Sequence, residues 1–356
     1  MMADMKHGFR VFTLLTLFAS ACQDQGPELR PVQVQGEFVA YAAFDEVELC
    51  EGTATYADAW MRAVATRLEI DPAALLPTTY YYVDSSVTDK QCPGGSPHCA
   101  RMEDGQILIF SQNPLHRHEL AHAVHLSAWP AGRVLLREGL ASLFGEVEWT
   151  PGSPLTAEEI DVAIEARSAV DEPSVYGIGL RIVYWTLLRH GPAAFEQFWY
   201  ASSELSSAAA FRAEFQDHFG ESLDAMLDDV AEESHSSIAL CPGEPRGWEN
   251  GSWTMRSPRG CEDDGVYGSA GSYDYGVRRE SIMEITQPGT YEITVSHSPS
   301  NGQGVFITQC QDLFAAWLLH AGTEITVELE PGRYRVTTEQ SAPEDEGVRV
   351  EIRPAN

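Results

Sequence analysis

The sequence predicts an α+β domain followed by an all-β sandwich domain. Its 356 residues exceed what one hydrophobic core usually serves, so we expect two domains. Residues 37–233 mix short apolar runs with longer amphipathic segments, the pattern of strands alternating with helices. After residue 234, glycines and prolines separate short alternating stretches up to the C-terminus. We therefore expect a first domain over 37–233, a linker over 234–247 and a β-sandwich over 248–356.

The N-terminus has the composition of an export signal. Lys6 and Arg10 form a basic start, residues 11–19 are an apolar core, and small residues precede Cys22. The apolar run is far shorter than the roughly 20 residues that a membrane-spanning helix needs. We expect residues 1–21 to be a signal peptide and the protein to be exported.

The small residues before Cys22 resemble the bacterial lipobox. The resemblance implies lipidation of Cys22 and a polar tether over residues 22–36. Because Gln23 rather than an aspartate follows Cys22, it also implies the outer membrane of a Gram-negative cell. Ordinary cleavage after Ala21 is the alternative.

The other six cysteines are an even number in a chain bound for an oxidising compartment, which predicts disulfides. Cys92 and Cys99 bracket a compact Pro/Gly loop whose ends can meet, so we pair these two first. The sequence leaves four partners open: Cys50, Cys241, Cys261 and Cys310. His98 beside Cys99 also suggests a second metal site, but a disulfide hairpin explains the pattern better.

The first domain is predicted from the periodicity of its apolar residues. Residues 53–68 place Trp60, Val64 and Leu68 on one face of a helix. The expected strands are 38–44, 80–83 and 107–110. Further helices are expected at 157–170, 178–190, 192–204 and 221–233.

Within this domain, His118-Glu-Leu-Ala-His122 has the HExxH pattern. Histidines four residues apart share one helix face, so both imidazoles can hold one metal ion. Glu119 can take a proton from a water beside that ion. Asn113 is the expected N-cap and Pro114 the expected first residue of the helix that carries this motif. Residues 127–130 are expected to end it.

A catalytic zinc site needs a third protein ligand. His125 lies roughly 10 Å along the helix from His118, too far to join both imidazoles easily. We expect His125 to cap the helix end or to support the ligands from outside. Glu138 lies in an apolar helical segment, 135–141, which can pack beside the motif helix.

Glu138-Gly-Leu-Ala, following His118 to His122, resembles the second metal motif of gluzincins, which are peptidase MA-like zinc peptidases. The resemblance implies a zincin-like fold, Zn²⁺ held by His118, His122 and Glu138, Glu119 as general base, and a peptide or protein substrate. Gly139 and Ala141 are small residues that would let the two metal-bearing helices approach closely.

The segment 176–192 resembles the helix that follows the metal motifs in such proteins. A tyrosine at the start of that helix faces the active site, which implies Tyr176 as the stabiliser of an oxyanion. The alternative, which the sequence supports equally, is that Tyr176 is only buried in the core. Arg181, Tyr184 and His190 are weaker alternatives.

In the second domain, residues 287–295 and 330–338 each place a Pro-Gly turn before an alternating strand. Tyr291, Ile293 and Val295 share one strand face, as do Tyr334 and Val336, which favours a sandwich. Three aromatic residues could form a carbohydrate-binding platform, although core positions are commoner: Trp248, Trp253 and Tyr267.

A formal charge of −30 disfavours nucleic-acid partners and anionic lipid head groups, because phosphate binding requires clustered Lys and Arg. We therefore expect membrane contact only through the lipid at Cys22. The predicted function is an exported zinc peptidase. The alternative is a catalytically inactive cell-envelope scaffold or binding protein that retains zinc.

Overall fold

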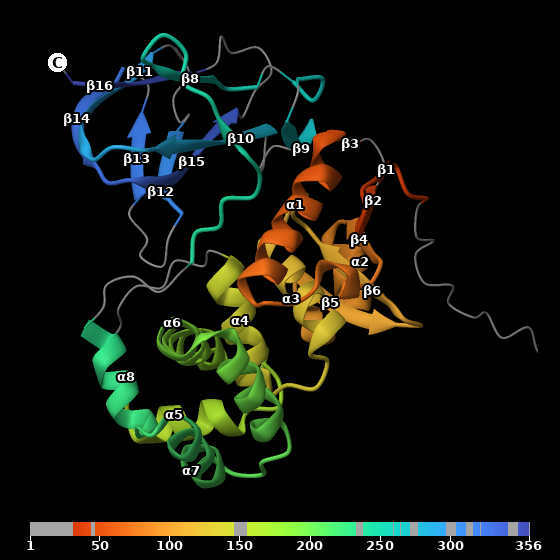
Figure 1. Cartoon of the computed structure of the whole chain (residues 1–356). Coiled ribbons are helices and arrows are strands. Elements are labelled where there is room, and N and C mark those ends of the chain that lie inside the picture. The colour runs from red at the N-terminus through yellow and green to blue at the C-terminus, as the bar shows by residue number, and fades with distance from the viewer. Residues whose placement is uncertain are drawn as a thin grey trace, which may run out of the picture.

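The structure, a computed structural model, describes residues 31–43, 47–145, 155–232, 238–258, 260–263, 265–270, 277–296, 304–310, 316–320, 322–340 and 348–355. The predicted signal peptide, Cys22 and most of the predicted tether lie outside these residues. A helix-rich N-terminal part is followed by a β-rich C-terminal part, as the sequence predicts (Figure 1). Within the described ranges, no helix combines the length and the apolarity that a bilayer crossing requires.

A five-stranded sheet in the N-terminal part has the order β1-β2-β4-β6-β5. Its central strands β2, β4 and β6 run parallel, and the strands at the two edges pair antiparallel. The strands are β1 (Val34–Gln35), β2 (Val39–Ala43), β4 (Thr78–Tyr82), β5 (His98–Glu103) and β6 (Gln106–Ser111). The three strands predicted here are therefore present, and β5 is an additional strand that borders the sheet.

Helices cover this sheet and extend beyond it (Figure 1). They are α1 (Gly52–Arg67), α2 (Ser85–Gln91), α3 (Arg117–Ala128), α4 (Val134–Gly145), α5 (Ala157–Glu165), α6 (Ser174–Ser203), α7 (Ala208–Phe219) and α8 (Leu223–Glu232), with 3-10 turns at Pro72–Ala74 and Pro93–Gly95. Trp60 and Val64 of α1, Ile109 of β6 and Leu120 of α3 belong to one fully buried apolar cluster. The core therefore joins the motif helix to the sheet.

The helices differ from the prediction in four respects. Helix α3 begins at Arg117 rather than at Pro114, because the carbonyl of Asn113 accepts hydrogen bonds from Tyr80 and Ser111 and holds that segment in a turn. Helices predicted at 178–190 and 192–204 form one element, α6, which changes direction at Gly191, where φ is +80°. Helix α5 ends at Glu165, and α7 was not predicted.

Two sheets form the β-rich part. One has the order β13-β12-β15-β10-β9-β3 with β7 beside β10, where β3 is Glu48–Leu49, and the other has the order β14-β11-β16-β8. The strands are β7 (Pro245–Arg246), β8 (Trp253–Arg256), β9 (Val266–Ala270), β10 (Val277–Ile285), β11 (Gly289–Ser296), β12 (Gly304–Gln309), β13 (Ala316–His320), β14 (Glu324–Leu329), β15 (Gly332–Gln340) and β16 (Arg349–Pro354). Their inner faces share one apolar core.

The two predicted Pro-Gly turns lead into β11 and β15, and their tyrosines behave alike. Tyr291 and Tyr334 are buried, and each hydroxyl donates a hydrogen bond of 2.9 Å to the carbonyl four residues earlier. Trp253 and Tyr267 are also buried. The reading of Trp253 and Tyr267 as an exposed carbohydrate platform is therefore wrong, because Trp253 belongs to the apolar core between the sheets and Tyr267 stacks on Tyr56 and donates a hydrogen bond to Glu280.

One strand from the N-terminal part completes a C-terminal sheet. Strand β3 (Glu48–Leu49) pairs with β9, and Cys50, directly after it, forms a disulfide with Cys261. Thr53 also exchanges hydrogen bonds with the backbone of Gly268. The chain therefore ties its two parts together covalently and through the backbone.

A buried carboxylate lies at the same junction. Glu280 of β10 forms an ion pair with Arg117, the first residue of the motif helix α3. It accepts hydrogen bonds from Tyr56 at 2.7 Å and from Tyr267 at 2.9 Å, and Arg335 lies 3.8 Å away. Burial alone would raise the pKa of Glu280, but these cations and donors outweigh it and lower the pKa to about 2. Glu280 is therefore ionised and fully partnered.

Candidate metal centre

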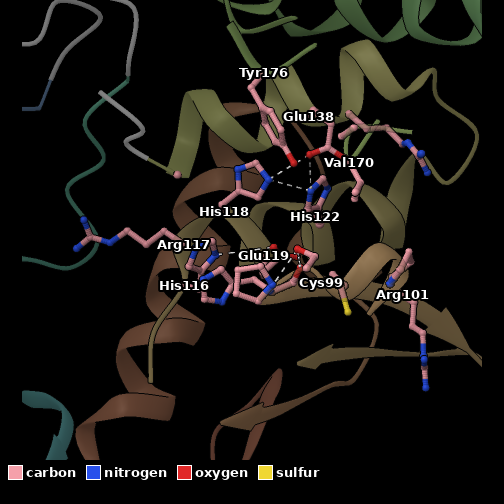
Figure 2. Close-up of a pocket in the computed structure, with 18 of the residues that line it drawn as sticks. Cys99, Arg101, His116, Arg117, His118, Glu119, His122, Glu138, Val170 and Tyr176 are labelled. Carbon is pink, nitrogen blue, oxygen red and sulfur yellow. Dashed lines mark hydrogen bonds and ion pairs between the residues drawn. The ribbon is translucent and has the colours of Figure 1, made fainter. Parts of the chain in front are cut away.

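Helices α3 and α4 bring His118, His122 and Glu138 together (Figure 2). The distance between His118 Nε2 and His122 Nε2 is 3.1 Å. Oε2 of Glu138 lies 3.2 Å from Nε2 of His118 and 3.3 Å from Nε2 of His122. Both histidines and the glutamate are at least mostly buried, and this group could bind a metal ion.

The spacing of these three atoms matches one metal ion. Ligands about 2.0 Å from a tetrahedral zinc ion lie about 3.3 Å from each other, because the edge of a tetrahedron is longer than its radius. The three edges seen between His118, His122 and Glu138 are 3.1, 3.2 and 3.3 Å. Three protein ligands would leave the fourth position of such an ion open.

Glu119 lies beside these ligands on α3. Its side chain is buried, and Oε2 has no hydrogen-bond partner among the described residues. Burial raises the pKa of Glu119, while His122 and His118 oppose that rise and Glu138 adds to it. A buried carboxylate oxygen without a partner is costly, so it fits a role in holding a water molecule or substrate.

His125 supports a ligand instead of joining the group. Its Nε2 lies 2.8 Å from Nδ1 of His122, whose Nε2 faces Glu138. Burial and the nearby positive charges of His122 and Arg137 lower the pKa of His125 well below its usual value, so its ring is neutral. If a metal were bound to Nε2 of His122, Nδ1 of the same ring would carry the proton. This N–H would donate a hydrogen bond to Nε2 of His125, which would fix the orientation of the His122 ring.

Replacing His125 with leucine should weaken metal binding while the fold persists. The substitution removes the acceptor of His122 Nδ1, and loss of such a partner typically lowers metal affinity about 10- to 100-fold. Competition with a chelator of known affinity measures this. His190→Gln, at an exposed position remote from the pocket, is the control. Equal affinity in wild type and His125→Leu would show that His125 does not position the ligand.

Two glycines of α4 let neighbouring helices pack closely against it. One of them, Gly139, contacts a different helix from the one that the sequence suggested. A Cβ on Gly139 would lie 2.2 Å from the backbone of Gly179 in α6, so Gly139 permits close packing of α4 on α6 rather than on α3. That expectation was wrong for Gly139, because successive residues of a helix point about 100° apart, so Gly139 faces α6 while Glu138 faces the histidines of α3. At the end of α4, a Cβ on Gly145 would approach Cβ of His118 to 2.9 Å. Gly145 therefore makes room for the first ligand.

Tyr176, near the start of α6, lines the same pocket and points its hydroxyl toward the ligands (Figure 2). Its ring centroid lies 5.8 Å from that of His118. Burial, with the charges of Glu138 and Glu119, raises the pKa of Tyr176 to about 12, so the hydroxyl stays protonated. Arg181 and Tyr184 are buried and His190 stacks on Trp185; all three lie outside the pocket lining.

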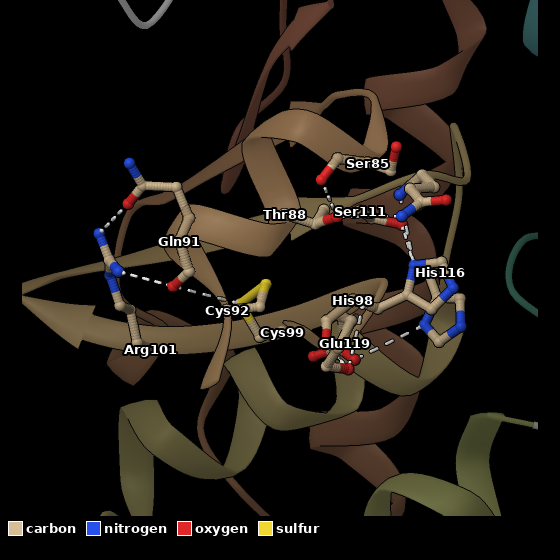
Figure 3. Close-up of a disulfide and its surroundings, with 12 residues drawn as sticks. Ser85, Thr88, Gln91, Cys92, His98, Cys99, Arg101, Ser111, His116 and Glu119 are labelled. Atoms are coloured by element: carbon tan, nitrogen blue, oxygen red, sulfur yellow. Dashed lines mark hydrogen bonds and ion pairs between the residues drawn. A yellow bond between two sulfur atoms is a disulfide. The ribbon is translucent and has the colours of Figure 1, made fainter. Parts of the chain in front are cut away.

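The pocket beside the ligands has a volume of about 1010 Å³, and residues 98–101 of β5 form one wall. The disulfide between Cys92 and Cys99, the pair favoured by the sequence, anchors the start of this strand (Figure 3). Because Cys99 is in a disulfide, the second metal site suggested by His98 is wrong. His98 instead stacks on His116, with ring centroids 3.9 Å apart, and Nδ1 of His98 lies 2.9 Å from Oγ of Ser111.

Two features of the pocket were missed from the sequence. Burial and neighbouring imidazoles lower the pKa of His116 to about 2 and that of His98 to about 4, so both rings are neutral, and His116 lies next to Glu119, with Nδ1 3.9 Å from Oε1. Arg137 lines the pocket one residue before Glu138. A charged residue inside the apolar run 134–144 was a visible signal for Arg137. No local pattern pairs His98 with His116, which meet only through the fold.

No family model and no curated protein matches the chain. Some solved structures align with about a third of it. The pre-peptidase C-terminal domain of a Bacillus anthracis collagenase aligns over its whole length with 31% of this chain, at 12% identity and a TM-score of 0.20. A carbohydrate-binding module of Cellvibrio mixtus lichenase 5A aligns over 89% of its length with 30% of this chain, at 17% identity and a TM-score of 0.17.

Proposed function

We propose that the protein is an exported zinc-dependent peptidase of the gluzincin type, with a zincin-like domain over residues 37–233. One observation carries the proposal: His118, His122 and Glu138 converge at the spacing of three ligands on one tetrahedral ion. They do so on the wall of a large pocket, with an unpartnered carboxylate oxygen of Glu119 beside them.

The side chains would divide the chemistry as follows. A bound zinc ion would act as a Lewis acid and lower the pKa of a water molecule in its open position. Glu119 would accept a proton as water attacks the scissile carbonyl, and would pass that proton to the leaving amine. Tyr176 would donate a hydrogen bond to the developing oxyanion, since its hydroxyl remains protonated.

The position of strand β5 favours a peptide as the substrate. It is the edge of its sheet and, among the described residues, pairs only with β6. Residues 98–101 of this strand also line the pocket. An extended peptide could add to such an edge through main-chain hydrogen bonds, which would hold a scissile bond next to the ligands whatever its side chains.

The three disulfides are consistent with an oxidising compartment outside the cytoplasm: Cys50–Cys261, Cys92–Cys99 and Cys241–Cys310. Lipidation of Cys22 at an outer membrane remains part of the proposal. Mass spectrometry of the mature protein from membranes would test it, because a lipidated N-terminal cysteine has a diagnostic mass. An unmodified N-terminus at Cys22 would show cleavage after Ala21 by an ordinary signal peptidase.

Glu119→Gln should abolish peptide hydrolysis and leave metal content unchanged. The amide cannot accept the proton, and loss of a general base typically lowers the rate about 10²- to 10⁴-fold. Mass spectrometry of a diverse peptide mixture, incubated with the zinc-loaded protein starting after Cys22, measures cleavage. Glu158→Gln, at an exposed position on α5, is the matched control.

The outcomes separate the two candidate functions. Cleavage by wild type and Glu158→Gln, but not by Glu119→Gln, would support the peptidase. Hydrolysis by Glu119→Gln at the wild-type rate would contradict the assigned base. If wild type holds zinc and cleaves nothing, the inactive cell-envelope scaffold becomes the better description.

A further inference from the structure

The charge of the pocket is opposite to that of the protein. The chain has 53 acidic residues against 23 Lys and Arg. The only acidic residues that line the pocket, within the described ranges, are Glu119 and Glu138, both already assigned to the metal centre. Five arginines line it: Arg101, Arg117, Arg137, Arg167 and Arg278. A pocket that gathers cations in so acidic a chain points to an anionic ligand.

Some of these arginines are already engaged. Arg101 donates to the backbone and side chain of Gln91 and pairs with Glu103. Arg117 is bound to Glu280 and Tyr56 at the junction with the C-terminal part. These contacts fix the pocket wall, so Arg101 and Arg117 are poor candidates for binding a ligand.

Arg137 is placed differently. It lies on α4, where Val134, Arg137 and Glu138 share the face that lines the pocket. Its charge acts on both His122 and His125, so the guanidinium is close to the metal centre. The side chain is half-buried, its Nε is fully buried and has no hydrogen-bond partner among the described residues, and no carboxylate of those residues pairs with it.

A half-buried guanidinium without a counter-ion is costly to keep, because it loses hydration without gaining a partner. Guanidinium binds a carboxylate through two parallel hydrogen bonds, the strongest pairing open to it. Peptides carry carboxylates on Asp and Glu side chains and at the C-terminus. Arg167, an exposed pocket residue on the loop between α5 and α6, adds a second positive charge.

We propose that Arg137 is a specificity residue that binds a carboxylate of the substrate next to the scissile bond, so that the pocket selects anionic peptides. This inference rests on the proposed peptidase function of the same site. Arg137 acts in substrate recognition, and Glu119 remains the catalytic base. At physiological salt, repulsion between an acidic peptide and the acidic protein surface is screened over about 8 Å. The arginines that line the pocket therefore determine its preference for peptide charge.

The test uses peptides that differ only in charge, presented to zinc-loaded wild type, Arg137→Gln and Arg189→Gln. Arg189 is an exposed arginine of α6 outside the pocket, so its substitution controls for the loss of one positive charge. Wild type and Arg189→Gln should cleave Glu or Asp peptides about 10- to 100-fold better in kcat/KM than their Gln or Asn counterparts. Arg137→Gln should lose this preference, so that the ratio of kcat/KM for acidic and neutral peptides falls to near 1.

Amidated and free C-termini separate the two sources of the carboxylate. If amidation removes the preference, the pocket binds the chain end and the enzyme is a carboxypeptidase. If Glu→Gln inside the peptide removes it, the pocket binds a side chain. Arg137→Glu should then favour Lys or Arg peptides, a reversal that a merely structural role would not produce. A uniform loss of kcat/KM over all peptides in Arg137→Gln would overturn the proposal.

A binding measurement keeps this inference separate from the peptidase function. Zinc-loaded Glu119→Gln, alone and combined with Arg137→Gln, is titrated with fluorescent acidic peptides and their amide counterparts. Anisotropy should show tighter binding of the acidic peptides, about 10-fold or more, that disappears in the double variant. Selective binding without hydrolysis by wild type would keep the carboxylate site and reject the peptidase. Equal binding of acidic and amide peptides would reject the carboxylate site.

Discussion

Glu280→Ala should lower the free energy of unfolding by about 3 kcal/mol or more, because it leaves Arg117 buried without its carboxylate. The side chains of Glu280 and Arg117 are 5% and 13% exposed, so water cannot replace the lost partner. Tyr56 and Tyr267 would also lose their acceptor. Chemical denaturation of oxidised protein, followed by tryptophan fluorescence, measures the change.

Glu284→Ala is the matched control, since Glu284 lies on the same strand β10 with an exposed side chain. Its effect should stay within about 0.5 kcal/mol. A Glu280→Ala protein as stable as Glu284→Ala would contradict a stabilising role for the buried carboxylate.

The same carboxylate predicts a pH dependence. The pKa of Glu280 is about 2 in the folded protein and near 4.5 in the unfolded chain. Its ionised form therefore stabilises the fold fully above about pH 4.5, and this contribution is lost as the pH falls toward 2. The difference in stability between wild type and Glu280→Gln should be largest near pH 7 and shrink over that interval. A difference that does not change with pH would show that Glu280 titrates alike in both states.

Glu138→Ala should reduce metal affinity by more than about 100-fold. Loss of an outer partner of a ligand already lowers affinity about 10- to 100-fold, and Glu138 supplies one of the three ligand atoms that converge among the described residues. Competition with a chelator measures the affinity. Zinc at about 100 times its Kd should stabilise wild type by about 2.7 kcal/mol, seen as a rise in Tm. That rise should be absent in Glu138→Ala at the same concentration.

Glu158→Ala, on the exposed side of α5, controls for the loss of a carboxylate elsewhere. Unchanged zinc content and an unchanged rise in Tm in Glu138→Ala would mean that another residue completes the site.

Much of the candidate metal centre could be predicted because it is encoded locally. The spacing of His118 and His122 fixes their common face once the segment is helical, and Glu119 follows from the same turn. Glu138 was predicted from a resemblance, since its contact with the histidines of α3 depends on how two helices pack. The helix start was wrong by three residues because Asn113 bonds to Tyr80 and Ser111, partners that no local pattern reveals.

The sequence by itself determined the order of an α+β part and a β-rich part, the motif helix with its ligand spacing, and the inward faces of β11 and β15. These follow from periodicities of 3.6 and 2 residues and from turn chemistry. Only the tertiary structure decided that His125 supports His122, that Arg137 faces the pocket, and that Glu280 pairs with Arg117. Each of these contacts depends on packing between side chains brought together by the fold, which the period of a single segment cannot specify.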